Sequence, residues 1–377
     1  MVASSFIKIF SIVMLVALSI SAQRECPSIQ AENNDTEKKR FIVIFDKKVK
    51  NAAEDNYEIM KECYKIQVQN INSDEKNKVE EDKIFRRHRR AEDDHPTRNV
   101  DRIDQAKRPL NGKFIYPDSA GEGVNIFIVD GGISLTHREF GGRAKFGRAF
   151  CKGCEKEYDI NKHGTIVASV AAGKTVGVAR KANIIDVRVL SYKGGTTTDL
   201  IEGLSFVIHK HKNSKYKNSI VNMSLNVIPP SRALNNVVKE VTDAGIHMTV
   251  SAGNFETDAC GQSPASAPSA ITVGATFDTN DTIADFSNFG KCVDIFAPGV
   301  NAHGAEAYDD NGYVVFSGTS FSSPLVAGTL ALLISKNGNK PPAELTKDLI
   351  KLSTKGVVKG LKHKKGTPNT FLRTPAP

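Results

Sequence analysis

The chain has 377 residues, which is enough for one sizeable domain or two small ones. Hydrophobic residues make up 40% of it and charged residues 25%, so disorder throughout the chain is excluded. Its 15 prolines and 29 glycines are too few for a collagen-like or low-complexity protein.

The formal net charge of +9 is spread along the chain, apart from two short basic clusters. One cluster, at 86–90, lies in an expected linker, and the other, at 362–365, lies near the C-terminus. A nucleic-acid-binding protein usually concentrates positive charge on one folded face, and the sequence contains no nucleic-acid-binding motif. We therefore expect no nucleic-acid partner.

The first 22 residues have the pattern of a secretory signal peptide. Lys8 precedes an apolar run from Ile9 to Ile20, and the small residues Ser21 and Ala22 follow it. Cleavage is expected after Ala22. The alternative is a membrane anchor, but the run is shorter than the roughly 20 residues that cross a bilayer. We expect a protein that is secreted or held in the lumen of the secretory pathway, with no membrane segment in its mature form.

The secretory route permits disulfide bonds among the six cysteines, which are Cys26, Cys63, Cys151, Cys154, Cys260 and Cys292. Six cysteines allow many pairings, so their spacing does not fix the bonds. Cys151 and Cys154 could form a redox or zinc pair, but two further zinc ligands at suitable spacing are not evident. A local disulfide or two free thiols is the simpler interpretation.

The sequence pattern changes near residue 114. Before that point, 41–45 is a predicted buried strand, 51–66 suits a helix and 74–94 is densely charged. After it, apolar strands alternate with helical stretches. The expected strands are 124–129, 184–189, 220–224, 247–251 and 271–273, and the expected helices lie near 163–172, 199–211 and 231–244. This alternation predicts an α/β fold with a parallel sheet, helices on both faces, and an active site at the carboxyl ends of the strands.

Four segments place a chemically useful side chain at the boundary of a predicted element. Asp130 follows a strand, His163 opens a helix of small residues, Asn254 follows a strand and Ser320 begins an apolar helix. Taken alone, each has a plainer interpretation, as a turn, capping or loop residue. Taken together, they have the Asp, His, Ser chain order of subtilisin, with an amide that could donate to an oxyanion.

Over about residues 119–336 the chain resembles the subtilisin-like serine proteases of the proteinase K branch, most specifically around Ser320 and His163. The resemblance implies a subtilisin-like parallel sheet flanked by helices and a serine endopeptidase activity. Ser320 would attack the peptide carbonyl, His163 would transfer the proton and Asp130 would orient the imidazole. Asn254 and the Ser320 N–H would hold the oxyanion.

The resemblance also implies binding sites around these residues. The residues that would flank an extended substrate backbone are Gly194, Gly195, Ser224, Leu225 and Asn226. Cys260 and Cys292 match a family disulfide. Pro268, Ala270 and Asp294 match a calcium site made of two carbonyls and a carboxylate, a donor set that suits this ion. A structural calcium ion is thus the candidate cofactor, and no catalytic cofactor is expected.

The residues before this segment resemble the family's inhibitory prodomain. The segments 41–49 and 79–85 match parts of it, Glu80-Glu81-Asp82 matches its closing motif, and self-cleavage would fall around Arg86–Ala91, where a trypsin- or furin-like protease could also cut. We expect a signal peptide (1–22), a propeptide (23–90) with a small α+β inhibitor-type prodomain at about 40–90, and a peptidase domain (91–377). The partners would be protein or peptide substrates and the chain's own propeptide, and a monomer is expected.

Several residues depart from the family pattern. Gly131 follows Asp130 where Thr or Ser is usual, and the other departures are Ile166, Asn226, Val227, Phe321, Ser322, Ser323 and Leu325. None of them removes a triad or oxyanion group, although the side chain of Asn226 would crowd the pocket for the residue before the scissile bond. A second hypothesis therefore stays open, in which the protein is a pseudoprotease that binds peptides without cleaving them.

Three sequons for N-glycosylation occur, at Asn34, Asn222 and Asn280. A glycan requires an exposed asparagine. Asn222 lies beside a predicted core strand and is a poor candidate.

Overall fold

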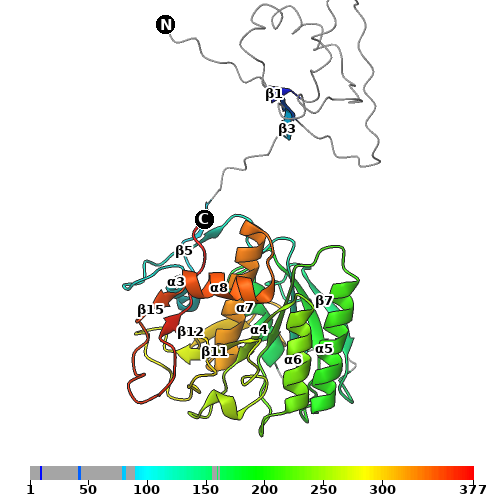
Figure 1. Cartoon of the computed structure of the whole chain (residues 1–377), viewed down its shortest axis with the longest axis vertical. Coiled ribbons are helices and arrows are strands. Elements are labelled where there is room, and N and C mark those ends of the chain that lie inside the picture. Colours follow the sequence, from blue (N-terminus) through cyan, green and yellow to red (C-terminus); the bar gives the residue numbers. More distant parts are fainter. Residues whose placement is uncertain (1–8, 11–40, 44–78, 82–89, 155–158, 160–161) are drawn as a thin grey trace, which may run out of the picture. The chain divides into compact units, whose positions relative to one another are not determined.

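The structure is a computed structural model that describes residues 9–10, 41–43, 79–81, 90–154, 159 and 162–377. The chain divides into two compact units, 1–87 and 88–377, which are drawn in Figure 1. In the first unit β1 (Ile9–Phe10), β2 (Phe41–Val43) and β3 (Val79–Glu81) form an antiparallel sheet in that order. The helix expected over 51–66, two cysteines and one sequon lie outside the described residues; these are Cys26, Cys63 and Asn34.

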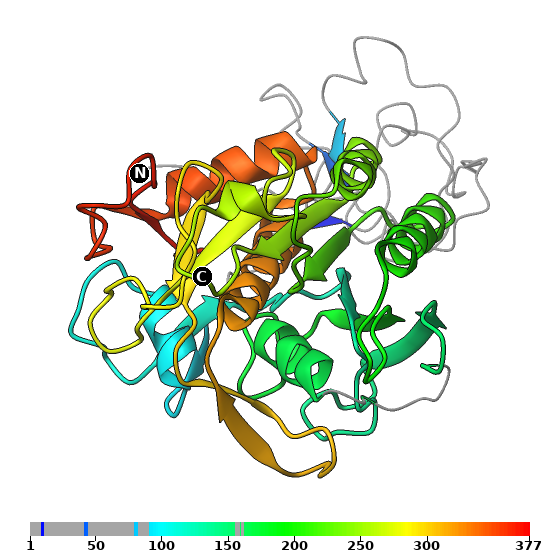
Figure 2. The ribbon, with the colours of Figure 1, turned by 90° about the horizontal axis from the view of Figure 1, so that it is seen from below.

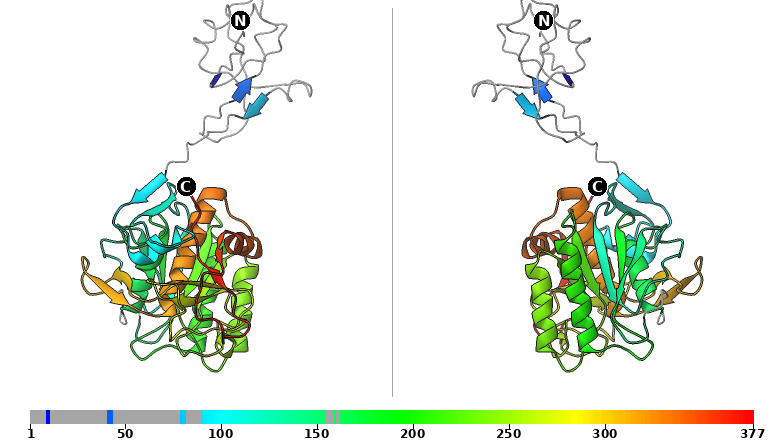
Figure 3. Two further views of the ribbon diagram at one scale, coloured as in Figure 1. Left: turned by 90° about the vertical axis from the view of Figure 1, so that its left-hand side faces the viewer. Right: turned by 90° about the vertical axis from the view of Figure 1, so that its right-hand side faces the viewer.

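A nine-stranded sheet forms the centre of the second unit (Figure 3), in the order β15-β16-β12-β11-β10-β9-β6-β8-β7. All neighbouring strands run parallel except β15, which is antiparallel to β16. The strands are β6 (Asn125–Asp130), β7 (Ala144–Ala149), β8 (Asn183–Arg188), β9 (Ser219–Met223), β10 (His247–Ser251), β11 (Ile271–Thr276), β12 (Ile295–Pro298), β15 (Thr354–Lys355) and β16 (Thr370–Phe371). The predicted α/β fold is confirmed.

The sheet is buried on both faces because its strands carry apolar side chains at successive positions. Along β6, Ile126 and Ile128 enter one hydrophobic core, whereas Phe127 and Val129 enter the other. Helices α4 (His163–Ala172) and α7 (Thr319–Asn337) cover the first face. Helices α5 (Thr197–Lys212) and α6 (Arg232–Asp243) lie side by side on the second (Figures 1 and 3).

Shorter elements surround this sheet. They are β4 (Arg90–Asp93), α3 (Arg98–Ile103), β5 (Phe114–Pro117), the 3₁₀ turn η2 (Ala259–Gly261), β13 (Ala302–Ala305), β14 (Tyr313–Phe316) and α8 (Pro342–Leu352). Strands β13 and β14 form an antiparallel hairpin that packs beside α4 (Figure 2). Among the helices that the structure describes, none is both long and apolar enough to cross a membrane.

The strand order reverses at β6, and this reversal positions the site. After β6 the chain forms β7 and β8 on one side of it, and then β9 to β12 on the other side. At such a point the loops leave the sheet in opposite directions and open a crevice at the carboxyl ends of the strands. Asp130 is the last residue of β6, so its carboxylate lies at that edge.

An ion cluster attaches α3 to the 278–281 loop. Arg102 is fully buried and donates to both carboxylate oxygens of Asp281, at 2.7 and 3.0 Å. Its guanidinium also lies 4.2 Å from the ring centroid of Phe371. Arg108 donates to the same carboxylate at 3.0 Å but is 24% exposed. Burial opposes ionisation of Asp281, but the two arginines hold the pKa of its carboxyl below the usual value.

We therefore predict that Arg102→Met destabilises the protein by on the order of 3 kcal/mol, because it leaves a buried carboxylate with weaker compensation. The solvent-accessible pair is worth less, so Arg108→Met should have the smaller effect. Thermal unfolding of both variants measures the difference. Equal unfolding midpoints for the two variants would contradict the assignment.

Candidate active site

Asp130 and His163 meet where β6 ends and α4 begins. The Nδ1 atom of His163 lies 2.9 Å from each carboxylate oxygen of Asp130. Asp130 is 1% exposed, whereas the His163 side chain is 28% exposed. A Cβ atom on Gly164 would lie 2.1 Å from the carbonyl oxygen of Gly132, so only glycine lets α4 begin this close to the strand. This explains why a glycine follows His163.

The environment of His163 favours its protonated form. Burial alone would lower the pKa of the imidazole, but the charge of Asp130 and its hydrogen bond outweigh that effect. The charge of Asp159 acts in the same direction, and the pKa of His163 is raised above its usual value. An imidazolium formed here by proton transfer would therefore be stabilised.

Ser320 is the second residue of α7, and its contacts fix the start of that helix. Its Oγ donates to the carbonyl of Ser224 at 3.4 Å, and Ser224 Oγ donates to the carbonyl of Ser320 at 2.8 Å. The ring of Phe321 lies 5.7 Å from the ring of His163, centroid to centroid. The start of α7 therefore lies against the start of α4. The first amides of a helix have no acceptor within it and attract negative charge.

Asn254 follows β10 and faces the same helix start. Its Oδ1 accepts from both the N–H and the hydroxyl of Thr319, each at 2.8 Å. With the oxygen held, the amide nitrogen is directed to the turn before Ser320: a Cβ atom on Gly318 would lie 3.5 Å from Asn254 Nδ2. Thr319 therefore holds the Asn254 side chain against the start of α7, with its amide nitrogen near Gly318.

A chain of buried polar side chains leads to Ser320, and it includes Ser323, one of the residues that depart from the family pattern. Ser323 donates to Asn222 Oδ1 at 2.8 Å, Asn222 donates to Ser224 Oγ at 3.0 Å, and Ser224 donates to Ser320. Asn222 is fully buried, so its sequon is closed to a glycan. Ser323 thus replaces an apolar helix residue without leaving its hydroxyl unpaired. Two other departures, Ile166 and Leu325, lie in the hydrophobic core.

The remaining substrate-binding candidates lie on two loops. Ser224, Leu225 and Asn226 follow β9, and the amide of Asn226 lies 3.1 Å from Ser251 Oγ at the end of β10. Gly194 closes a turn with Ser191 through two backbone hydrogen bonds of 3.0 Å, after β8. A Cβ atom on Gly195 would lie 2.1 Å from the Val189 carbonyl oxygen. The contacts described here tie the first loop to Ser320, and they do not tie the second loop to it.

Two disulfides form in the described part of the chain, Cys260–Cys292 and Cys151–Cys154. The second is the local bond that was one of the two simpler interpretations of this pair. The two sulfur atoms of that pair are therefore not available as metal ligands.

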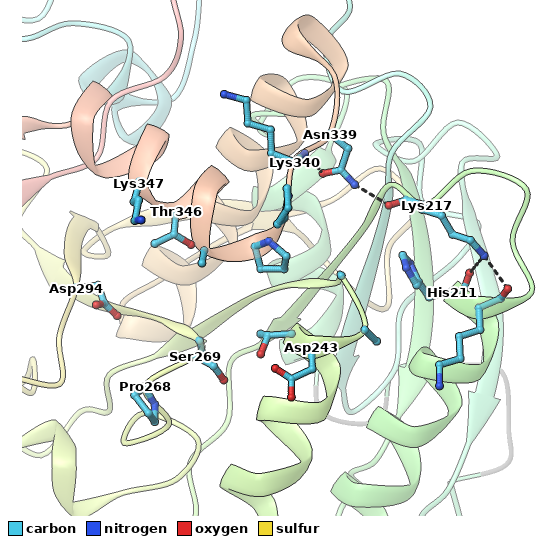
Figure 4. A pocket seen from close by; sticks show the side chains of 18 residues that line it. His211, Lys217, Asp243, Pro268, Ser269, Asp294, Asn339, Lys340, Thr346 and Lys347 are labelled. Atoms are coloured by element: carbon cyan, nitrogen blue, oxygen red, sulfur yellow. Dashed lines mark hydrogen bonds between the residues drawn. The ribbon is translucent and has the colours of Figure 1, made fainter.

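The expected calcium ligands lie before the first residues of their strands, whereas Asp130 is the last residue of β6. Pro268, Ala270 and Asp294 precede β11 and β12, and all three line a pocket of about 1200 Å³ (Figure 4). Burial raises the pKa of Asp294 to about 6, against the hydrogen bond that its carboxylate accepts from the Thr272 amide at 2.8 Å. A desolvated carboxylate of this kind is an oxygen donor that suits a calcium ion.

Some contributors to the site are not evident in the sequence alone. Thr319 orients the Asn254 amide, Asn222 links two serines, and Asp159 accepts from the Thr165 amide at 2.8 Å within the first turn of α4. Asp159 had one available signal, because an acidic residue near a helix start is favoured by the helix dipole. Thr319 and Asn222 had none, because their partners are distant in sequence.

Comparison with known proteins agrees with this geometry. Residues 121–367 match the model of the subtilase family. The chain is 42% identical over 250 residues to subtilisin-like protease 1 of Pseudogymnoascus destructans, covering 66% of this chain and 61% of that protein. It is 38% identical over 276 residues to subtilisin-like protease 3 of Saccharomyces cerevisiae, covering 68% and 57%. The chain thus spans less than two thirds of these relatives.

A solved structure of a cold-adapted subtilisin-like serine proteinase has a TM-score of 0.69 and 38% sequence identity to the chain. The superposition covers 75% of this chain and 100% of the other. The matched region contains both elements that meet at the site, α4 and α7. The chain therefore belongs to the subtilase family.

Proposed function

We propose that the protein is a serine endopeptidase with the triad Asp130, His163 and Ser320. The observation that carries the proposal is the pair of 2.9 Å contacts between His163 and Asp130, next to the start of α7. A buried carboxylate on Nδ1 sets the tautomer in which Nε2 can accept a proton. The family relationship supports the same chemistry.

The reaction would proceed through an acyl-enzyme. Ser320 Oγ attacks the peptide carbonyl while His163 takes its proton, and Asp130 stabilises the resulting imidazolium. The negative oxygen of the tetrahedral intermediate accepts from Asn254 Nδ2 and from the Ser320 N–H. His163 then gives its proton to the leaving amine, and water releases the acyl group by the same steps.

The substrate would bind as an extended strand beside Ser224, Leu225 and Asn226, with Gly194 and Gly195 on its other side. Asn226 stands where the family usually has glycine, and its amide contacts Ser251. A side chain in place of glycine would narrow the space for the residue before the scissile bond. We propose that it restricts large side chains at that position.

The N-terminal segment would direct the enzyme into the secretory pathway and inhibit it until the propeptide is removed. We propose a signal peptide at 1–22, an inhibitory propeptide at 23–90, cleavage around Arg86–Ala91, and secretion or residence in the secretory lumen as a monomer. Asn280 is the exposed sequon of the described chain and would carry the glycan.

Part of the second basic cluster, at 362–365, has a structural role. Lys364 lies 3.3 Å from Glu256 and 4.1 Å from the centroid of the Phe289 ring.

We predict that Ser320→Ala abolishes labelling by a fluorophosphonate after propeptide removal. Peptide hydrolysis should fall by about 10⁶-fold, a magnitude known for subtilisin. Ser317→Ala is the matched control, because it removes an exposed hydroxyl three residues away. A Ser320→Ala protein that still labels would refute the triad. A wild-type protein that binds peptides but neither labels nor cleaves them would establish the pseudoprotease instead.

We predict that Asn226→Gly broadens specificity. The ratio of kcat/KM for phenylalanine against alanine before the scissile bond should rise by roughly 10-fold, because the pocket gains volume. A matched pair of peptide substrates measures this ratio. An unchanged ratio would show that Asn226 does not limit the pocket.

We predict that calcium stabilises the wild-type protein through Asp294. At 100 times its dissociation constant the ion should add about 2.7 kcal/mol, seen as a higher unfolding midpoint. Asp294→Asn should lose this response. Asp243→Asn, which alters an exposed carboxylate on the lining of the same pocket, should keep it. A midpoint that rises equally in both variants would exclude Asp294 as a ligand.

A further inference from the structure

Helix α4 has no capping side chain from its own N-cap residue. Lys162 occupies that position with φ of 62° and makes no side-chain cap hydrogen bond. Its ammonium group is directed to the β13–β14 connection, 3.0 Å from Glu306 Oε1 and 4.4 Å from the ring centroid of Tyr308. The amides of the first turn, which begins with His163, therefore need acceptors from elsewhere in the chain.

Asp159 supplies one of them. Its side chain is buried, and its Oδ2 accepts from the Thr165 amide at 2.8 Å. Thr165 is the third residue of α4, and its hydroxyl accepts from the Ser134 amide at 2.9 Å. The first helical turn is thus attached on one side to Asp159 and on the other to the chain that follows β6. His163 belongs to this turn.

The backbone of Asp159 lies close to Gly132, which follows β6, and Arg188 of β8 lies close to the same glycine. A Cβ atom on Gly132 would lie 3.0 Å from the Cα of Asp159 and 2.7 Å from Arg188 Nε. Arg188 is fully buried and donates to Asp186 at 2.8 Å and to the Cys154 carbonyl at 3.3 Å. The close approach to Gly132 restricts where the backbone of Asp159 can lie.

The charged groups around His163 and Asp159 form one cluster. Asp130 comes from β6, Asp186 and Arg188 come from β8, and Asp159 precedes α4. Burial raises the pKa of Asp186 to about 7, Arg188 opposes that rise, and the charge of Asp159 adds to it. The same charge raises the pKa of His163. The negative charge of Asp159 therefore acts on the ionisation of both Asp186 and His163.

We propose that Asp159 is a positioning residue for catalysis: it fixes the first turn of α4 by accepting from the Thr165 amide, and it places a buried carboxylate beside the turn that carries His163. This inference rests on the proposed triad chemistry, in which His163 becomes charged when it takes the proton from Ser320. The two parts of the role, hydrogen bonding and charge, can be separated by substitution.

The test compares three substitutions in the mature enzyme by the pH profile of kcat/KM. Asp159→Asn keeps an oxygen for the Thr165 amide but removes the charge, so the acidic limb should move to lower pH. Asp159→Ala removes both, and kcat should also fall, by about 10- to 100-fold, with a much smaller change in KM because the base is misplaced. Asp159→Glu keeps the negative charge, so its acidic limb should lie closer to that of the wild type than the acidic limb of Asp159→Asn does.

Ser231→Ala is the matched control, because it removes the side-chain cap of α6, where Ser231 Oγ accepts from the Leu234 amide at 3.2 Å. It should lower the unfolding midpoint and leave the acidic limb unchanged. If Asp159→Asn keeps the wild-type acidic limb, or Asp159→Ala keeps the wild-type kcat, the positioning role is wrong.

A second measurement does not depend on activity. In a Ser320→Ala background, NMR of labelled histidine should give a lower pKa for His163 when Asp159→Asn is added. An unchanged titration would overturn the charge effect. Failure of the proposed function is distinguishable, because in that case Ser320→Ala or His163→Ala would retain hydrolysis whatever the titration of His163 shows.

Discussion

The hydrogen-bonded contact between His163 and Asp130 is the interaction on which the rest of the site depends. It joins the last residue of β6 to the first residue of α4, two elements that the reversal of strand order brings to one edge of the sheet. The close approach needs Gly164, because any side chain there would collide with the Gly132 carbonyl. The backbone requirement for glycine at position 164 and the chemical requirement for histidine at position 163 therefore fall on adjacent residues.

The sequence predicted the elements that repeat a simple pattern. The strand at 247–251 and the helix at 163–172 were placed with the bounds they have in the structure, since both fit the regular alternation of strands and helices along the chain. Strands β7 and β12 and the β13–β14 hairpin were not predicted. Residues 144–149 include Lys145 and Arg148 at an edge of the sheet, and 295–298 is a very short run, so neither has a clear period. Such strands are determined by tertiary pairing.

The site shows the same division between local and distant signals. Asp130, His163, Asn254 and Ser320 lie at or near element boundaries, and their order along the chain made them recognisable as a set. The chain from Ser323 through Asn222 to Ser224 could not, because its hydrogen bonds connect α7 to β9 across about a hundred residues. This chain also explains how Ser323 is tolerated near Ser320. A buried hydroxyl that replaces an apolar group costs little once it has a partner.

The most direct test of the account is the proton NMR spectrum of the mature enzyme at low field. The account predicts a strongly deshielded Nδ1 proton from His163, because that proton would lie between the imidazole and a buried carboxylate. The resonance should disappear in Asp130→Ala and persist in Asp294→Asn, which alters a carboxylate that precedes β12 and does not contact His163. A spectrum without this resonance in the wild-type enzyme, or one that keeps it in Asp130→Ala, would contradict the central claim.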